Sequence, residues 1–274
     1  MHIVHATDFS AASDVAFAHA LALALVHEAR LTLVHVGRID RDGFDWSRFP
    51  GVRPRLAAWG LLREGADKRD VARELGIEVE KVVFDGRDPV RTLVDQVDAD
   101  IPDVLVLAHH PAPRAFDRLR RSVSQTVARA ALVPTLVVPE GARGFVALAD
   151  GGLHLQRVLV GVDREPDPRP AVAGAARLLG LLATPGTEVE LFHVGDAADM
   201  PEIPDADLPG ARLGRLVRPG VPDAEIAARA TETAADLVVL ASAGRTGVVD
   251  ALTGSVTARV LARTTTPLLA VPAA

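Results

Sequence analysis

The stretch from Asp236 to Pro272 reads DLVVLASAGRTGVVDALTGSVTARVLARTTTPLLAVP, and it decides the fold. Its first apolar run, Leu237 to Ala241, is typical of a buried strand, and a second one follows at Leu268 to Val271. Between them, a turn rich in small residues leads into a helix opened by Thr253 to Ser255. Unpaired N–H groups and the positive end of the helix dipole meet at such a helix start. The stretch therefore predicts an anion site, with phosphate as the first candidate.

The composition is that of a soluble globular protein. A chain of 274 residues with 49% hydrophobic content can form one large or two medium domains. His19 and His27 interrupt the longest apolar region, which also lacks the features of a signal peptide, so we expect no membrane span and a cytoplasmic location. The absence of cysteine excludes disulfides, thiol catalysis and thiolate metal sites.

The charge pattern argues against a nucleic-acid partner. The formal net charge is −6 and the pI is about 5.8. The arginines are scattered among carboxylates and do not gather in one basic segment. We therefore expect no nucleic acid among the partners.

The first half of the chain alternates apolar runs with segments of helical spacing. This alternation predicts a parallel sheet covered by helices on both faces. The expected strands are 2–7, 31–36, 78–84, 104–107 and 135–138, and the expected helices start at Ser10 or Ser13 and span 59–75, 89–97 and 122–131, with 37–54 as a loop.

From Arg157 onward the pattern of the first half begins again. RVLVGVD (157–163) matches HIVHATD (2–8), VELFHV (189–194) matches LTLVHV (31–36), and ADLVVLA (235–241) matches PDVLVLA (102–108). A repeat of this length indicates domain duplication. We expect one domain at 1–139 and a second at 157–274.

The two copies differ in length between their second and fourth strands. The offset falls from 158 residues at His35 and His193 to 133 at Ser122 and Ser255, so the second copy is 25 residues shorter there. It should lack the 59–75 helix and have, at 196–214, an ordered loop or a mobile lid before a short strand at 213–218. Between the domains, EGARGFVALADGGLHLQ (140–156) predicts a hairpin connector.

These fragments, in this order, resemble the universal stress protein family in its tandem two-domain form. The resemblance implies two Rossmann-like (adenine nucleotide alpha hydrolase-like) domains, each a five-stranded parallel sheet flanked by helices. The nucleotide-binding branch has a Gly, two residues, Gly, nine residues, Gly, Ser/Thr signature after the fourth strand. The second copy has this spacing, and only the first glycine differs, as Ala241; the later positions are Gly244, Gly254 and Ser255.

By this resemblance the second domain binds ATP or a related adenine nucleotide, with Mg²⁺ only as carried by the nucleotide. Glycines let the backbone approach phosphates, and a carboxylate can accept a hydrogen bond from an adenine amine or a ribose hydroxyl. These positions lie at the carboxyl ends of parallel strands, where such folds bind ligands. The predicted contact residues are Gly161, Val162, Asp163, Val194, Ala241, Gly244, Gly254, Ser255 and Val256.

The first copy is degenerate at the signature. It has Ala108, Pro111 and Arg121 before Ser122, and Pro111 removes a backbone donor. We therefore expect nucleotide in the second domain only. The first domain would have a structural or regulatory role, pairing with the second as a built-in version of the dimer that single-domain relatives form, with a homodimer of the whole chain and an unidentified protein partner left open.

Several residues have a plainer interpretation beside the functional one. Asp8 and Asp163 can simply cap the helices that follow them. His35 and His193 are expected to be hydrogen-bonded core histidines more often than catalytic or metal-binding ones. His109 and His110, with the arginines of 114–121, favour a solvated basic face over an anion site. No spacing typical of a metal site or of a nucleophile with its base is present.

Three functions fit these observations. The leading one is a stress-response or regulatory module that senses adenine nucleotide. The second is a slow ATPase or hydrolase in the same pocket, for which Asp163, Arg245 and Asp250 are the available candidates to activate water. The third is a ligand-free scaffold in which the strands at 135–138 and 268–271 pair edge to edge, within the chain or between chains.

Overall fold

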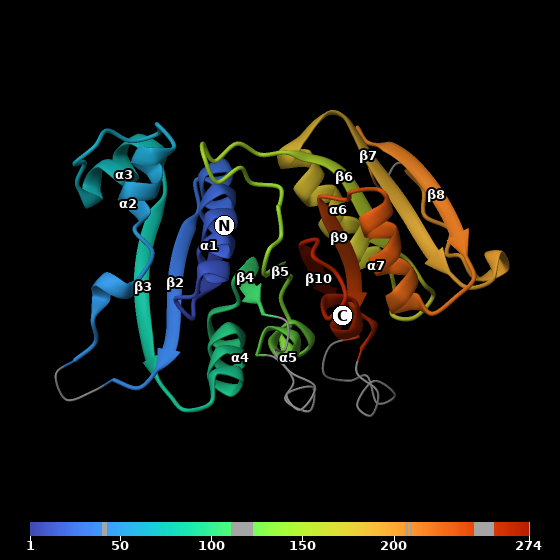
Figure 1. The fold of residues 1–274 in the computed structure, drawn as a ribbon, viewed down its shortest axis with the longest axis horizontal. Helices are drawn as coiled ribbons and strands as arrows, with labels where there is room; N and C mark the ends of the chain where they lie inside the picture. The colour runs from blue at the N-terminus through green and yellow to red at the C-terminus, as the bar shows by residue number, and fades with distance from the viewer. Residues whose placement is uncertain (40–42, 111–122, 206–207, 209, 244–254, 274) are drawn as a thin grey trace.

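The chain forms a single ten-stranded sheet with helices on both faces (Figure 1). The computed structural model describes all residues except 40–42, 111–122, 206–207, 209, 244–254 and 274, and only the backbone of 181–185. The strand order is β3-β2-β1-β4-β5-β10-β9-β6-β7-β8. Counted outward from the central β5–β10 pair, the equivalent strands of the two halves therefore follow in the same order.

The first half of the sheet is entirely parallel, as predicted. Helices connect its strands, and α1 begins at the predicted N-cap Ser10, whose side chain accepts a hydrogen bond from the Ser13 backbone N–H. The elements are β1 (His2–Ala6), α1 (Ala11–His27), β2 (Arg30–Gly37), η1 (Trp46–Arg48), α2 (Val52–Ala58), α3 (Lys68–Leu75), β3 (Glu78–Asp85), α4 (Pro89–Asp100), β4 (Val104–His109), α5 (Val123–Ala130) and β5 (Thr135–Pro139).

The second half repeats this arrangement with one difference. Its five strands are also parallel to one another, which confirms the predicted pair of Rossmann-like halves. Between β7 and β8 the described residues hold a 3₁₀ turn in place of α2 and α3. The elements are β6 (Leu155–Gly161), α6 (Arg169–Leu182), β7 (Ala183–Val194), η3 (Ala197–Asp199), β8 (Arg212–Arg218), α7 (Pro222–Glu232), β9 (Leu237–Ser242), α9 (Val256–Leu261) and β10 (Leu268–Pro272).

The prediction of one helix over 59–75 is wrong. Helix α2 begins within the predicted 37–54 loop and is capped by Trp59, and α3 starts only at Lys68. Gly60 has φ of +72°, a left-handed conformation that a continuing helix cannot contain. The helix-like spacing over 59–75 came from buried apolar residues of the connection, Trp59, Leu62 and Ala66, followed by α3.

The two halves join through the antiparallel pairing of β5 with β10. Leu269 lies opposite Leu136 in this ladder, and both side chains are buried. The pairing occurs within the chain, which is one of the two forms expected for these final strands. Between the halves, the connector forms an antiparallel bridge from Val146 to Leu153, with the Ala147 N–H donating to the Gly152 carbonyl at 2.8 Å.

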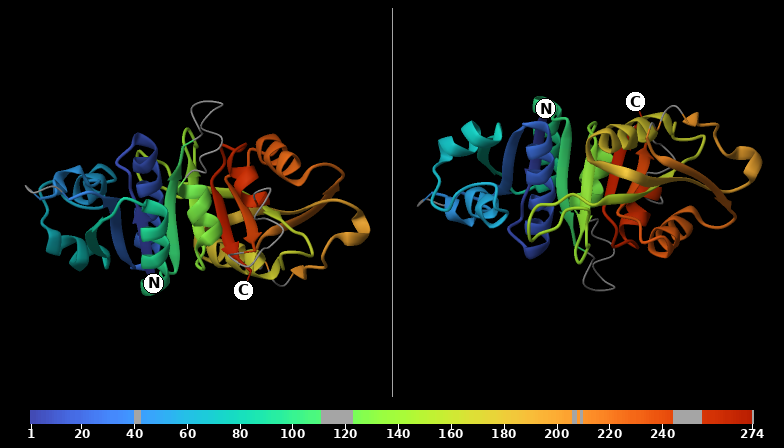
Figure 2. Two further views of the ribbon diagram at one scale, coloured as in Figure 1. Left: turned by 90° about the horizontal axis from the view of Figure 1, so that it is seen from below. Right: turned by 90° about the horizontal axis from the view of Figure 1, so that it is seen from above.

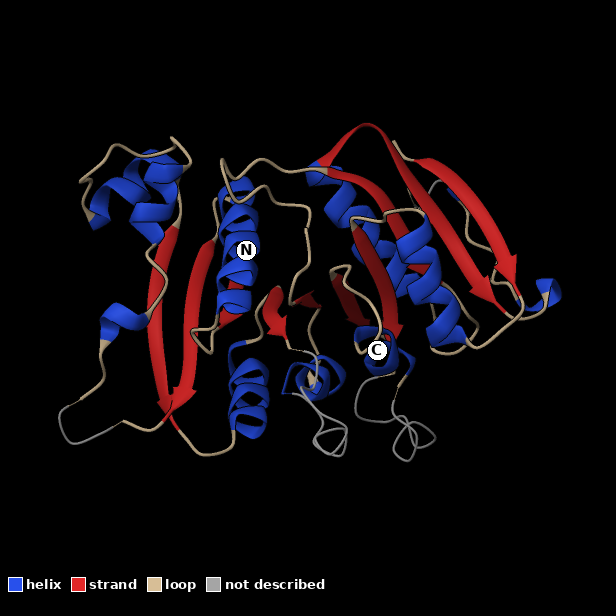
Figure 3. Ribbon diagram, viewed as in Figure 1, coloured by secondary structure: helices blue, strands red, loops and turns tan. Residues whose placement is uncertain are grey.

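The core is continuous across the junction (Figures 2 and 3). On one face, α1 and α6 cover an apolar cluster that includes residues of both halves, from Ile3 and Phe17 to Leu237 and Leu269. On the other face, α4, α5, α7 and α9 cover two smaller clusters. Within the described part of the chain, no helix is both long and apolar enough to span a bilayer.

Because the core is shared, a destabilising substitution in one half should also lower the stability of the other half. Leu269→Ala in β10 should lower the free energy of unfolding by about 2–5 kcal/mol, since it deletes a buried leucine side chain. Both tryptophans lie in the first half. We expect tryptophan fluorescence and far-UV circular dichroism to report the same lowered urea midpoint. Leu132→Ala, at a residue 55% exposed, serves as the control and should leave the midpoint nearly unchanged. A tryptophan transition unaffected by Leu269→Ala would contradict a shared core.

Candidate functional site

We call the carboxyl ends of the strands in each half its notch, and the two notches share a backbone frame. In the first half, the Glu140 N–H donates to the His109 carbonyl at 2.8 Å. In the second, the Ala273 N–H donates to the Ser242 carbonyl at the same distance. The repeat offset of 133 residues matches these pairs, so the two halves hold the ends of their fourth and fifth strands in the same way.

The histidines at the ends of β2 and β7 are part of this frame. The His35 Nδ1–H donates to the Thr7 carbonyl at 2.8 Å, and the His193 Nδ1–H donates to the Val162 carbonyl at 3.0 Å. His193 is 2% exposed, and a Cβ added at Gly195 would lie 2.9 Å from its Nε2. Both rings therefore tie the first strand of a half to its second, which supports the interpretation as core histidines.

The second-half notch contains a small cavity of about 80 Å³. Most of the nucleotide contacts predicted from sequence come together there. Phe192, Ile226 and Leu240, which were not predicted, supply an apolar floor. The predicted residues that line the cavity are Gly161, Val162, Asp163, Val194, Ala241 and Val256.

Two features of the second-half notch depend on its small and polar residues. A Cβ at Gly161 would lie 2.4 Å from Leu240 Cδ2, so a side chain there would displace the cavity floor. Ser255 caps α9, and its Oγ accepts a hydrogen bond from the Ala258 N–H at 3.2 Å. Gly244 and Gly254, predicted to approach phosphate, lie outside the described residues, as do Arg245 and Asp250.

Asp163 faces solvent at the edge of this notch. Its Oδ1 accepts a hydrogen bond from the Arg164 N–H at 2.7 Å, and the residue is exposed. Arg164 itself forms an ion pair with Asp199 at 3.2 Å. The carboxylate of Asp163 therefore keeps acceptor capacity for a ligand.

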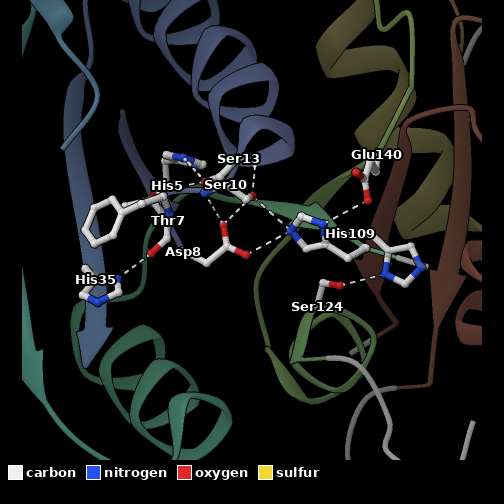
Figure 4. Close-up of polar contacts among 11 residues, drawn as sticks. His5, Thr7, Asp8, Ser10, Ser13, His35, His109, Ser124 and Glu140 are labelled. Carbon is white, nitrogen blue, oxygen red and sulfur yellow. Dashed lines mark hydrogen bonds and ion pairs between the residues drawn. The ribbon is translucent and has the colours of Figure 1, made fainter. Parts of the chain in front are cut away.

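The equivalent carboxylate of the first half, that of Asp8, is bound by neighbouring side chains (Figure 4). Asp8 Oδ1 accepts hydrogen bonds from the Ser10 N–H at 3.0 Å and from the Ser10 hydroxyl at 2.6 Å. Asp8 Oδ2 lies 2.9 Å from His110 Nε2, and His110 Nδ1 lies 3.2 Å from Glu140 Oε2. We call Asp8, Ser10, His110 and Glu140 the clasp. It ties the ends of β1, β4 and β5 together across the first-half notch.

The clasp changes the ionisation of Asp8. Partial burial acts to raise the pKa of Asp8, but the hydrogen bonds from Ser10 and the nearby His110 outweigh it, so this pKa lies below its usual value. The clasp was not predicted, because His110 was assigned to a solvated basic face. The available signal was that His110 and Glu140 each follow a strand end directly, and neighbouring parallel strand ends converge.

The Ser10 hydroxyl does not have the environment of an activated nucleophile. It lies 3.1 Å from His110 Nε2, but it donates to Asp8 and accepts the Ser13 N–H as the cap of α1. Its hydrogen-bonding capacity is therefore used in holding the turn. Among the described residues, no group of three or more His, Asp or Glu side chains is placed to hold a metal ion.

A profile of the Universal stress protein family matches residues 1–139 and 209–272. The chain belongs to the universal stress protein family. Both halves contribute to the match, which agrees with the tandem arrangement of the fold. Among curated proteins, none matches the chain significantly.

Two solved structures of similar fold span nearly the whole of this family member, and a third spans half of it. A universal stress protein from Archaeoglobus fulgidus DSM 4304 is 18% identical with a TM-score of 0.65, covering 99% of this chain and 96% of that one. A functionally unknown protein from Pseudomonas aeruginosa PAO1 is 16% identical with a TM-score of 0.64, covering 99% and 92%. A universal stress protein solved in complex with cAMP covers 50% of this chain and 96% of its own, at 24% identity and a TM-score of 0.35.

Buried histidines should make the stability of this universal stress protein depend on pH. Burial lowers the pKa of His5, His19 and His109 to about 4 in each case. In the unfolded chain these groups take up protons near pH 6.5, whereas in the folded chain they remain neutral to about pH 4. The free energy of unfolding should therefore fall as pH is lowered between these values.

His109→Gln tests this dependence, because the amide has no titration in that range and can still bond Ser124, whose Oγ lies 2.9 Å from His109 Nδ1. Urea unfolding at a series of pH values should show a shallower loss of stability in the variant, by on the order of 1 kcal/mol over the range. His154→Gln, at an exposed histidine, is the control. Equal pH slopes for His109→Gln and the wild type would contradict the assignment.

Proposed function

We propose that the second half binds ATP or a related adenine nucleotide and that the protein acts as a nucleotide-responsive module of the stress response. The observation that carries the proposal is the contrast between the two notches. Asp163 is exposed beside a cavity, whereas Asp8 lies within the clasp. At the positions of His110 and Glu140 the second half has Ala243 and Ala273, which carry only methyl groups.

The described cavity suits the apolar end of such a ligand. Its lining combines apolar side chains with the two carboxylates of Asp163 and Glu165, which matches an adenine ring with a polar amine or a ribose hydroxyl at its edge. The cavity is far smaller than a nucleotide, for which pockets typically measure about 300 Å³ or more. In this proposal the phosphates extend from the base end toward Ser255 and the glycine-containing segment before it, with Mg²⁺ carried by the nucleotide.

The aspartate pair provides a matched test of where nucleotide binds. Asp163→Ala should weaken ATP binding about tenfold or more, since a hydrogen bond to a charged acceptor is lost. Asp8→Ala should leave the affinity within about twofold of the wild type. Isothermal titration with ATP and Mg²⁺ measures both, and both carboxylates are exposed, so the fold should tolerate either change.

Two results would contradict the proposal. One is a wild-type protein that neither carries nucleotide as purified nor shows a thermal shift with ATP and Mg²⁺. The other is loss of binding in Asp8→Ala with full binding in Asp163→Ala, which would place the site in the first half.

A second experiment transfers the clasp. The double variant Ala243→His, Ala273→Glu should build an imidazole and a carboxylate beside Asp163 and reduce ATP affinity about tenfold or more through lost space and a competing partner for the carboxylate. Ala243→Ser, Ala273→Ser is the matched control and should bind almost as the wild type does. Undiminished binding in the His/Glu variant would show that the clasp does not account for the difference between the halves.

A further inference from the structure

A cavity of about 910 Å³ is lined by residues of the edge strand β3 and of η1, α2 and α3. We call η1, α2 and α3, which lie next to β3 in Figure 1, the arch. It shares no lining residue with the second-half notch. The second half has no matching arch among its described residues, since η3 and a loop occupy that place. The cavity is therefore a feature of the first half and is independent of the proposed nucleotide site.

Aromatic and aliphatic side chains form much of the cavity wall. The rings of Trp46 and Phe49 are stacked, with centroids 5.8 Å apart and planes 15° from parallel. Trp46 is 51% exposed, whereas Phe49 is buried, so the stacked pair forms an aromatic part of the wall that solvent reaches from one side. Val52, Val71 and Ile77 complete an apolar surface inside.

The charged groups around this apolar surface are mostly basic. Arg30, Arg53, Lys68 and Lys81 line the cavity against the two acidic residues Glu78 and Glu80, and the Arg30–Glu80 ion pair at 2.6 Å neutralises one of each. The cavity is therefore locally positive in a chain of net charge −6. Lys68 and Lys81 are the only lysines among 30 basic residues, so both lysines of the sequence face one cavity.

Lys81 is a partly buried cation of this cavity without an anionic partner among the described residues. Its ammonium lies 5.4 Å from the centroid of the Phe49 ring and forms no ion pair with any residue that the structure describes. Burial and the nearby Arg53 both lower the pKa of Lys81. A half-buried cation beside an aromatic face and a second cation loses part of its hydration without full compensation. An anion entering the cavity would supply the missing partner.

We propose that this cavity binds an amphipathic carboxylate, with the carboxylate at Lys81 and the apolar body against Trp46, Phe49 and Ile77. The apolar body can be an acyl chain or an aromatic ring system, since both fit walls of this composition. An uncharged analogue of the same shape would gain the apolar contacts but would leave the ammonium without a partner.

The test compares each carboxylate with its uncharged analogue. Isothermal titration of the full chain with dodecanoate and dodecan-1-ol, and with naphthalene-2-carboxylate and 2-naphthylmethanol, measures the contribution of the charge for either apolar body. We expect at least one carboxylate to bind about tenfold or more tightly than its alcohol. Lys81→Met should abolish this preference, and Lys81→Arg should retain most of it.

Location is tested independently of affinity. Reductive methylation followed by peptide mass spectrometry reports each lysine separately, because only Lys68, Lys81 and the terminal amine react. The bound carboxylate should slow methylation of Lys81 several-fold, and the alcohol should not. Arg87→Met removes one exposed positive charge outside the cavity and is the matched control for loss of charge; its preference for carboxylate should equal that of the wild type.

Three outcomes would overturn the proposal. Equal affinities for both carboxylates and their alcohols would remove the role of the charge. An undiminished preference in Lys81→Met would place the carboxylate elsewhere, and so would unprotected Lys81 in the presence of saturating carboxylate. Failure of ATP to bind would not affect any of these measurements, since the two sites share no residue.

Discussion

The antiparallel ladder between β5 and β10 is the interaction on which the rest of the structure depends. Each half by itself would end in an exposed apolar edge, and such an edge tends to pair with another chain. Here Thr135–Pro139 and Leu268–Pro272 satisfy each other's backbone groups and make one sheet. The apolar cluster under α1 and α6 then becomes continuous from one half to the other.

The two halves share a backbone frame at their strand ends but carry different side chains on it. The strand ends are held in the same way in both halves, by a histidine on the second strand and by a backbone hydrogen bond between the fourth and fifth strands. Within this common frame, the side chains at the strand ends differ. His110 and Glu140 fill one notch, and two alanines leave the other open.

In the first half, the clasp occupies the notch at the ends of β1, β4 and β5. A basic, aromatic-lined cavity lies at the edge strand β3 of the same half. Helices α2 and α3, which have no counterpart among the described residues of the second half, line that cavity together with β3. The 25 residues by which the copies differ in length therefore give the first half a cavity beside its edge strand. The proposed sites of the two halves take different anions, a nucleotide in one and an amphipathic carboxylate in the other.

The sequence by itself determined the duplication, the parallel α/β halves and the family, because apolar periodicity and motif spacing are local properties that can be read along the chain. It also identified six of the residues that line the second-half cavity. It overlooked the break at Gly60, since buried apolar residues of the connection before α3 keep a helix-like spacing. Only the tertiary structure decided that His110 reaches Asp8, 102 positions away, and that Lys81 lies under Phe49. Such contacts depend on which strand ends and connections packing brings together, and no local pattern records that.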